Sequence, residues 1–436
     1  MGPTAGASLP ALPYGLEWRL ALIPLITGVI GYATNWVAIR LLFNPLEFVG
    51  VRLPALKQVA PTLPRKLQQI PGVMEGRVGW QGIIPSRSAR MGSLAAEKGI
   101  SNIATEQEFY EEFDPDKIAE HILSAARPEV RELTERILET EHPQLWNDTP
   151  QPIRELVHAR VQARLPEIVD TITADVGENI DELLDLKLMV RNHLARNPEL
   201  LNRLFTEAGE RELNFIINSG FIIGTFLGLF SIPLFLYIDQ WWVLPLCGVA
   251  VGYLTNWLAL KIIFQPTEER RLGPLRLQGL FIKRQHEVAE AYAAVVANDI
   301  ITVSNIAESL LYGRQADRTR KMITDAIRPE VDRVVGLAGP TIRIATGPDS
   351  YERVREAFAT ESVDRTLEPL QDPEFNRQRS EAIRVLIRDR MRTLPPEEFA
   401  GLLRPAFKED EWMLILMGAG LGFVAGWLQL MVVTAV

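Results

Sequence analysis

The stretch that decides the fold is PLITGVIGYATNWVAIRLLFNP, at residues 24–45, which returns at residues 245–266 as PLCGVAVGYLTNWLALKIIFQP. Ten of the 22 paired positions are identical, and most of the others exchange one apolar residue for another. Neither stretch contains an acidic residue, and each has a single basic residue near its C-terminal end. A helix needs about 20 apolar residues to cross the hydrocarbon core of a bilayer. The sequence therefore predicts two related membrane-spanning helices.

Two further apolar runs, at residues 213–238 and 412–436, are equally suited to a membrane and carry no charged residue. Tyrosine and tryptophan, which prefer the headgroup level of a bilayer, stand at the ends of the spans, for example at Trp18, Trp241 and Trp242. The predicted fold is all-α, a polytopic membrane protein with four transmembrane helices.

The remaining residues divide into a short tail and two long polar regions. In chain order we expect a tail at 1–15, a membrane helix at 16–44, helical domain A at 45–212, membrane helices at 213–238 and 241–264, helical domain B at 265–411 and a membrane helix at 412–436. Apolar residues in both polar regions recur near the helical period, which predicts amphipathic helices.

The repeat extends beyond the spans, because further landmarks occur in the same order in both halves of the chain. These are Gln81-Gly82-Ile83-Ile84 with Gln278-Gly279-Leu280-Phe281, then Arg127-Pro128-Glu129-Val130 with Arg328-Pro329-Glu330-Val331, and finally two glycine ladders in the second and fourth spans. The chain is predicted to be two tandem copies of a helix–helical domain–helix unit. Two spans per copy give both copies the same orientation, so a pseudo-two-fold axis should run along the membrane normal.

Copy one contains an additional segment near residues 51–74. Pro45 and Gln81 are 36 positions apart, whereas their counterparts Pro266 and Gln278 are 12 apart, which leaves 24 extra residues in copy one. The segment is rich in proline and basic residues, and it fits either an interfacial amphipathic piece or a loop. The loop is the preferred interpretation.

Small residues recur at spacings of three and four along each span, which places them on one stripe of a helix. Lipid gives no hydrophobic drive between helices, so close backbone packing has to supply the attraction. The predicted helix-packing glycines are Gly28, Gly31, Gly220, Gly224, Gly228, Gly252, Gly418, Gly422 and Gly426. In this structural interpretation Asn35 and Asn256 form hydrogen bonds between helices.

The alternative interpretation is that polar residues of the two copies line a path through the membrane, because an amide in hydrocarbon is costly unless it is paired. The candidate intramembrane site comprises Thr34, Asn35, Trp36, Arg40, Thr255, Asn256, Trp257 and Lys261. The two basic residues also fit a simpler role, extending to the interface beside the tryptophans.

Basic residues within roughly 15 positions of the span ends gather on one side of the membrane. The side with the two polar regions has Arg52, Lys57, Arg203, Arg211, Arg270, Arg271, Arg276, Arg404 and Lys408, whereas the other side has Arg19 alone. We expect the protein to lie in the cell (inner) membrane. The positive-inside rule predicts that domains A and B lie on its cytoplasmic side and that both termini lie on the other side.

The sequence contains no pattern typical of an enzyme, a metal site or a cofactor site. The five histidines have no ligand spacing, Cys247 is the single cysteine, and no Walker loop or nucleophile elbow is present. A net charge of −9 argues against nucleic acid as a partner. The expected partners are membrane lipids and, through the helical domains, a second copy of the chain or another protein.

The repeated motifs resemble those of the YheB/YjiN-like bacterial membrane proteins, the family of domain of unknown function 445. The resemblance rests on Gly31-Tyr-Ala-Thr-Asn-Trp-Val-Ala-Ile-Arg40, Gly252-Tyr-Leu-Thr-Asn-Trp-Leu-Ala-Leu-Lys261, Gly82-Ile-Ile-Pro85 and Leu188-Met-Val190. Copy two departs from the pattern at Ile282, where proline is expected. The resemblance implies a bacterial cell membrane and no particular activity.

Two functions follow as hypotheses. The first is a structural or scaffolding protein whose cytoplasmic helical rods self-assemble or bind a partner. The second is a transporter or lipid conduit that uses the polar centre between the two repeats.

Overall fold

The structure is a computed structural model that describes residues 16–62, 64, 68, 70–141, 143–238, 240–272, 275–335 and 348–435. The predicted tail at 1–15 lies outside these residues. The described part is almost entirely helical, and four of its helices are long and apolar enough to cross a membrane. The prediction of an all-α polytopic membrane protein is therefore confirmed.

The four candidate spans are Ile23–Phe43, Glu210–Leu234, Val243–Phe264 and Glu411–Met431. A helix pair bent by 46°, Gln285–Ile300 and Val303–Tyr312, meets the same criteria of length and composition. The sequence analysis did not single it out, because its alanine-rich turns are interrupted by Glu287, Glu290 and other polar residues.

The chain forms two compact units, and each unit contains residues of both copies. Unit 1 consists of residues 1–91, 201–288 and 394–436, and unit 2 of residues 92–200 and 289–393. Domains A and B of the sequence analysis are thus divided between the units, and portions of both pack together in unit 2. Amphipathic helices have to bury an apolar stripe, and the helices of the two copies bury theirs against each other.

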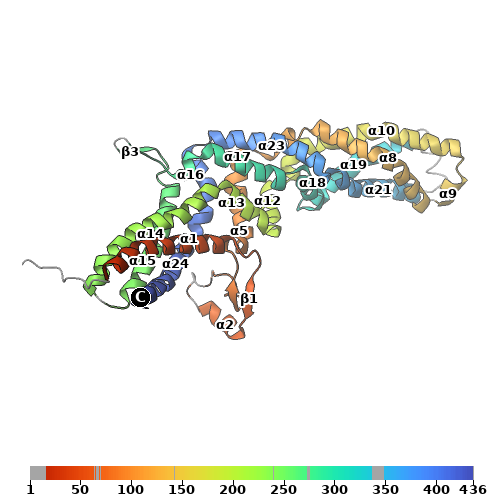
Figure 1. Cartoon of the computed structure of the whole chain (residues 1–436). Helices are drawn as coiled ribbons and strands as arrows, with labels where there is room; N and C mark the ends of the chain where they lie inside the picture. The colour runs from red at the N-terminus through yellow and green to blue at the C-terminus, as the bar shows by residue number, and fades with distance from the viewer. Residues whose placement is uncertain are drawn as a thin grey trace, which may run out of the picture. The chain divides into compact units, whose positions relative to one another are not determined.

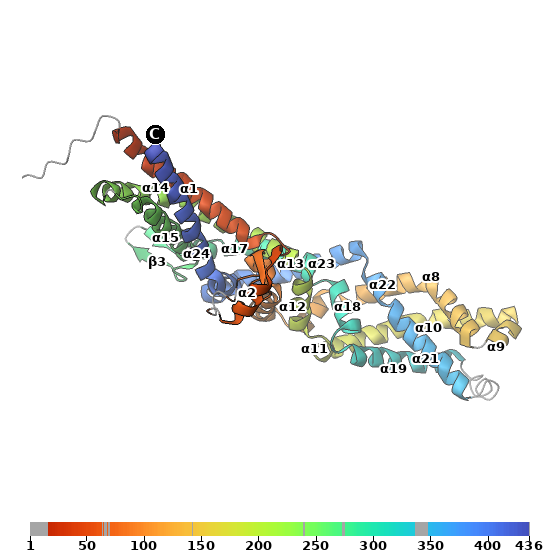
Figure 2. The same ribbon diagram turned by 90° about the horizontal axis from the view of Figure 1, so that it is seen from below.

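Unit 1 contains the membrane helices, which lie side by side in Figures 1 and 2. These are α1 (Leu16–Phe43), α14 (Glu210–Ile238), α15 (Val243–Phe264) and α24 (Pro396–Ala435). The tightest packing is within each copy, α1 on α14 and α15 on α24, and the copies meet through α14 with α15 and α1 with α24. Helices α14 and α24 begin before the predicted spans and continue into them without a break.

Shorter elements of unit 1 follow each first span in the same order in both copies. In copy one they are β1 (Val49–Arg52), α2 (Pro54–Val59), η1 (Ala60–Thr62), β2 (Arg77–Trp80), α4 (Ile83–Ser86) and α5 (Ser88–Leu94). In copy two they are β3 (Arg270–Leu272), β4 (Leu275–Leu277), α16 (Leu280–Lys283) and α17 (Gln285–Val295), and the later residues of α5 and α17 belong to unit 2. In copy one α13 (Pro198–Ala208) leads into α14. Each strand pair is an antiparallel hairpin.

The turn after each first span is built alike in the two copies. The amide of Gly82 donates to the carbonyl of Pro45 at 2.9 Å, and the amide of Gly279 donates to the carbonyl of Pro266 at 2.9 Å. The peptide bond before each of these prolines is cis. The repeated Q-G landmark of the sequence therefore marks the residues that hold this turn.

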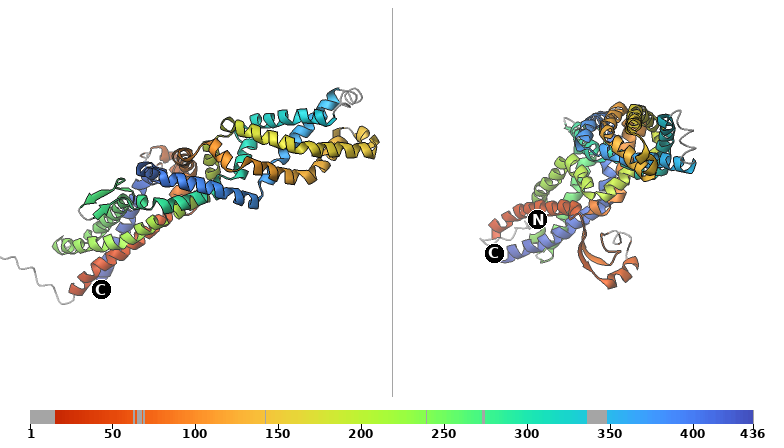
Figure 3. Two further views of the ribbon diagram at one scale, coloured as in Figure 1. Left: turned by 90° about the horizontal axis from the view of Figure 1, so that it is seen from above. Right: turned by 90° about the vertical axis from the view of Figure 1, so that its right-hand side faces the viewer.

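Unit 2 is a set of antiparallel helices. Copy one contributes η2 (Ala95–Ile100), α6 (Ser101–Ile103), α7 (Glu106–Glu112), α8 (Pro115–Glu141), α9 (Pro143–Asp148), α10 (Gln151–Glu178), α11 (Ile180–Leu183) and α12 (Leu186–Arg196). Copy two contributes η3 (Val296–Ile300), α18 (Val303–Tyr312), α19 (Ala316–Val335), α21 (Pro348–Arg365), α22 (Leu367–Leu370) and α23 (Pro373–Thr393). Figure 3 shows α8, α10, α19 and α21 running alongside one another, and α10 packs on both α8 and α19.

A buried ion pair joins the two copies inside unit 1. Glu212, in the first turn of α14, is buried, and both of its carboxylate oxygens accept from Nη1 of Arg284, at 2.7 and 2.9 Å. Arg284 also contacts Glu287 at 3.0 Å, and Glu287 contacts the exposed Arg211 at 3.1 Å. A carboxylate in the first turn of a helix is further favoured by the helix dipole.

Arg284→Met should destabilise the protein by about 3–5 kcal/mol, because it leaves the Glu212 carboxylate buried without a counter-charge. The double variant Glu212→Leu/Arg284→Met should recover most of that loss, since a buried ion pair can be replaced by apolar packing at little cost. Thermal unfolding of the purified protein in detergent micelles measures both. Arg211→Met is the control, because exposed ion pairs contribute at most about 1 kcal/mol. Equal shifts for Arg284→Met and Arg211→Met would contradict the prediction.

Candidate functional site

Each copy places the asparagine of its repeated T-N-W motif between two membrane helices. Asn35 of α1 donates from Nδ2 to the carbonyl of Ile216 on α14 at 2.8 Å, and Asn256 of α15 donates to the carbonyl of Leu414 on α24 at 2.9 Å. Both side chains are buried. In hydrocarbon an unpaired amide would be costly, so these bonds fix the register of each helix pair.

The nine predicted helix-packing glycines all lie where two backbones approach closely. A Cβ atom added at Gly31 would overlap the carbonyl of Gly220, and one added at Gly252 would overlap the carbonyl of Gly418. A Cβ atom at Gly220 would lie 2.7 Å from Nδ2 of Asn35. The same holds along both ladders, at Gly28, Gly224 and Gly228 in copy one and at Gly422 and Gly426 in copy two. Glycine at positions 220 and 418 thus leaves the space in which each asparagine reaches the carbonyl group of the partner helix.

The buried threonines next to the asparagines bond within their own helices. The hydroxyl of Thr34 donates to the carbonyl of Gly31 at 3.1 Å, and that of Thr255 donates to the carbonyl of Val251 at 2.8 Å. Among the described residues Oδ1 of Asn35 has no hydrogen-bond partner. The predicted polar residues are therefore brought together in two separate groups, one in each copy.

One buried polar contact does join the copies within the membrane. Gln429 of α24 donates from Nε2 to the hydroxyl of Thr27 on α1 at 3.3 Å, and both side chains are buried. The sequence analysis missed this pair. The available signal was a glutamine in the middle of an otherwise apolar span, since such a group needs a partner there.

The tryptophans and basic residues of the predicted site lie at the surface of the bundle. The guanidinium of Arg40 lies 5.4 Å from the ring centroid of Trp36, and Nζ of Lys261 lies 4.7 Å from that of Trp257. Both rings are exposed, as expected for side chains at the membrane interface. Lys261 also lines an open hollow of about 240 Å³ together with Arg404.

A second candidate site is an apolar cavity inside unit 2, here called the bundle cavity. It has a volume of about 200 Å³ and lies among α8, α10, α19 and α21. Its walls are mostly aliphatic, and they include Ile122, Leu133, Val161, Leu165, Ile327 and Val334. Apolar walls of this kind accept apolar molecules.

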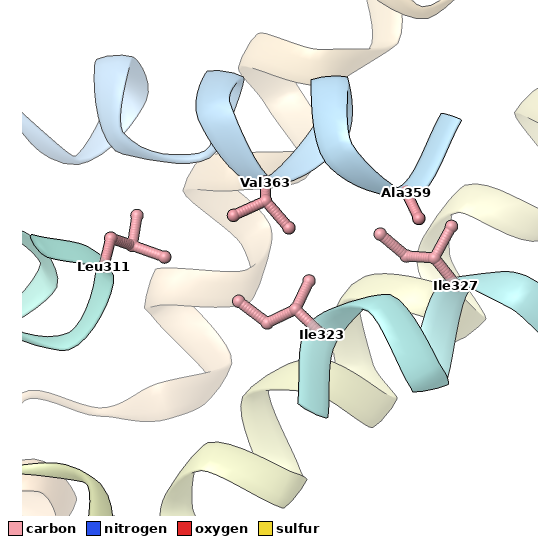
Figure 4. Close-up of a cluster of buried hydrophobic side chains, with 5 residues drawn as sticks. All are labelled: Leu311, Ile323, Ile327, Ala359 and Val363. Atoms are coloured by element: carbon pink, nitrogen blue, oxygen red, sulfur yellow. The ribbon is translucent and has the colours of Figure 1, made fainter. Parts of the chain in front are cut away.

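A smaller chamber of about 80 Å³ adjoins the bundle cavity, since Ile122, Ile172 and Thr366 line both. Figure 4 shows the buried cluster of Leu311, Ile323, Ile327, Ala359 and Val363, with Ile323 and Val363 pointing toward each other. Ile327 of this cluster lines the bundle cavity, whereas Leu311 and Ile323 line the smaller chamber.

Tyr110 closes part of the smaller chamber with a polar contact. Its hydroxyl donates to the carbonyl of Thr173 at 2.8 Å. Burial raises the pKa of the Tyr110 phenol well above its usual value, so the side chain keeps its proton at neutral pH. The chamber therefore stays uncharged.

Three charged side chains line the otherwise apolar bundle cavity. Arg365 and Glu129 form an ion pair at 3.3 Å. Glu330 is only 7% exposed, forms an ion pair with Arg333, and has no described hydrogen-bond partner at Oε2. The cavity thus offers one free acceptor next to a long apolar wall.

The cavity walls contain both copies of a sequence landmark. Glu129 and Val130 line it from α8, and the equivalent Glu330 and Val331 line it from α19. The sequence analysis recognised this repeated R-P-E-V motif but assigned it no site. The signal that could have predicted a site is the glutamate that occurs at the equivalent position of an amphipathic helix in each copy.

No catalytic constellation emerges from the described residues. Within them, no group of three or more histidine, cysteine, aspartate or glutamate side chains is arranged to hold a metal ion. The chemistry that the two sites support is the binding of apolar groups and the packing of helices.

Comparisons with known proteins give one match. A UPF0754 membrane protein of Halalkalibacterium halodurans is 36% identical to the chain over 66 residues. The alignment covers 14% of this chain and 18% of that protein, so the chain matches less than a fifth of its relative's length. No protein-family model matches the chain, and no solved structure matches it. Together with the four apolar helices, the similarity identifies an integral membrane protein.

Gly418→Val should destabilise the α15–α24 pair by about 1–3 kcal/mol, because the added side chain overlaps Nδ2 of Asn256 and the carbonyl of Gly252. Gly420→Val is the matched control, since nothing lies within 4 Å of a Cβ atom at Gly420. Its effect should stay within about 0.5 kcal/mol. Unfolding in micelles, followed by tryptophan fluorescence, measures both variants. A shift of the same size at the two positions would refute the close approach.

Proposed function

We propose that the chain is a lipid-binding membrane protein whose bundle cavity takes the acyl chain of a membrane lipid. The observation that carries the proposal is the cavity itself, about 200 Å³ among four helices with mostly apolar walls. The residues that line the cavity come from both copies, so the duplication supplies both sides of the site.

The energetics of the cavity favour an occupant. Each methylene group moved from water into such a site contributes about 0.8 kcal/mol. A chain of methylene groups therefore fits both the composition and the elongated lining of the cavity.

The charged residues in the cavity wall indicate the chemistry of the ligand's polar end. Oε2 of Glu330 lacks a described partner and can accept a hydrogen bond. Arg365 is already paired with Glu129 at 3.3 Å. The ligand is therefore an acyl lipid whose polar end carries a donor, such as a hydroxyl or ammonium group.

The proposal includes the location of the protein. By the positive-inside rule, basic residues such as Arg203, Arg211 and Arg404 favour a cytoplasmic position for the polar regions of a protein in the cell membrane.

Membership of the YheB/YjiN-like family belongs to the same proposal. It is supported by the twin T-N-W motifs at residues 34–36 and 255–257.

Scaffolding is the second candidate function, and exposed apolar residues on α10 favour it. Ile153 and Leu156 are half exposed and lie three positions apart, hence on one face of the helix. A second copy or a partner helix could cover them. Chemical crosslinking and native mass measurement test this role, and a bare monomer at all concentrations would count against it.

A transport path through the polar centre of the membrane helices has less support. Asn35 and Asn256 are each bound to a carbonyl of the partner helix within their own copy. If the path exists, the double variant Asn35→Leu/Asn256→Leu should abolish transport in a folded protein.

Filling the bundle cavity should block lipid binding. Ala126 lines the cavity, so Ala126→Phe should reduce acyl-chain labelling at least fivefold while leaving the protein folded. The probe is a phosphatidylethanolamine with a diazirine at the end of one acyl chain, incorporated in vesicles with the protein. After illumination, mass spectrometry of peptides should locate the label on α8, α10, α19 or α21 in the unmodified sequence.

The matched control is Ala163→Phe, the same substitution at an exposed position of α10 that does not line the cavity. It should label as strongly as the unmodified protein. Labelling confined to the membrane helices, or full labelling of Ala126→Phe, would overturn the proposal.

A further inference from the structure

The hairpin formed by β1 and β2 has one apolar face and one face without aliphatic side chains. Its register pairs Val49 with Trp80 and Val51 with Val78. Side chains alternate between the faces of a strand, so these four residues share one face. The other face carries Gly50, Arg52, Arg77 and Gly79.

The apolar face is exposed in the described structure. Val49, Val51 and Val78 are 65%, 70% and 53% exposed, and Leu53 extends the same face beyond β1. A contiguous exposed patch of aliphatic side chains marks a surface that another apolar phase covers.

On the opposite face the ring of Phe48 packs against glycine residues and Arg77. A Cβ atom at Gly50 would lie 2.8 Å from the ring of Phe48, and the same ring lies against Gly72. The guanidinium of Arg77 lies 5.6 Å from the Phe48 centroid and forms an ion pair with Glu75 at 3.1 Å. Gly50, Arg52 and Gly79 are exposed too, so the two faces differ in chemistry, aliphatic on one side and basic on the other, and not in exposure.

The hairpin is attached to the end of a membrane span. The indole of Trp80 donates from Nε1 to the carbonyl of Leu41 at 3.0 Å, in the last turn of α1. Only five residues separate Phe43, where α1 ends, from Val49. In Figure 1 and in the right-hand view of Figure 3, β1 and α2 project sideways from this end of α1.

We infer that the β1–β2 hairpin lies in the interface of the membrane that α1 spans, with Val49, Val51 and Val78 against the acyl chains. Arg52 and Arg77 face the phosphate groups and water. The occupant of the apolar face is the lipid leaflet, because the patch continues directly from a membrane span and has basic residues on its other side. The inference holds whatever ligand the bundle cavity takes.

The depth of insertion is limited by the backbone. A two-stranded hairpin has two edges with unpaired amide and carbonyl groups, and such edges do not occur in the hydrocarbon core. The hairpin therefore lies at the headgroup–acyl boundary, which is also the level at which tryptophan residues such as Trp80 gather.

The interfacial hairpin belongs to copy one alone. The hairpin of copy two has strands of three residues, and its register pairs Arg270 with Leu277, so a charged residue interrupts that face. The extra segment near residues 51–74 supplies α2 and η1 between the strands of copy one. The inference therefore favours the interfacial alternative for this segment over the loop that the sequence analysis preferred.

Site-directed spin labelling of the full chain tests the inference. With Cys247→Ala as background, single cysteines replace Val51, Val78, Arg52 or Arg77, all outside the membrane helices. The labelled proteins are reconstituted in vesicles of phosphatidylethanolamine and phosphatidylglycerol. Collision rates with oxygen, which concentrates in lipid, are compared with those of a water-soluble nickel chelate. The ratio of oxygen to nickel collisions should be at least threefold higher at positions 51 and 78 than at positions 52 and 77.

Two results would overturn the inference. A high nickel collision rate at all four positions means that the hairpin lies in water. Low rates of both reagents at positions 51 and 78 mean that protein covers the valines instead of lipid. Val51, Val78 and Arg52 are exposed and Arg77 is partly exposed, so the unfolding temperature of each labelled protein should stay close to that of the background, which verifies that the fold is retained.

Discussion

The membrane part of the protein depends on one constraint, the close approach of paired helices where lipid supplies no hydrophobic attraction. Glycines at Gly31 and Gly220, and at Gly252 and Gly418, let the backbones meet. That approach brings Asn35 and Asn256 within 2.8 and 2.9 Å of carbonyls on the partner helices. Without the glycines the asparagine amides would be buried without a partner. The close packing of the helices and the hydrogen bonds of the two asparagines therefore depend on each other.

Unit 2 is stabilised by a different force, the burial of apolar stripes from water. Four helices from the two copies meet through these stripes, but their side chains do not fill the space between α8, α10, α19 and α21. A tightly packed core normally leaves few voids larger than a water molecule. The retained cavity, together with the unpaired Oε2 of Glu330, is what turns a structural bundle into a candidate binding site.

Aromatic and basic side chains gather near the ends of the first spans. Trp36 with Arg40 and Trp257 with Lys261 lie where the first span of each copy ends. Trp80 ties the hairpin of copy one to the same level through Leu41. Aromatic rings and basic side chains both prefer that level, so the protein can hold its polar elements close to the lipid surface.

The sequence by itself determined the four spans, the repeat and the glycine stripes, because membrane helices and repeated motifs are local patterns that can be read without knowing the fold. Only the tertiary structure decided that parts of domains A and B form one unit, that the R-P-E-V motifs line a cavity, and that Gln429 meets Thr27. A helical period shows which face of a helix is buried but not its partner, and Asn35 finds its carbonyl 181 residues away.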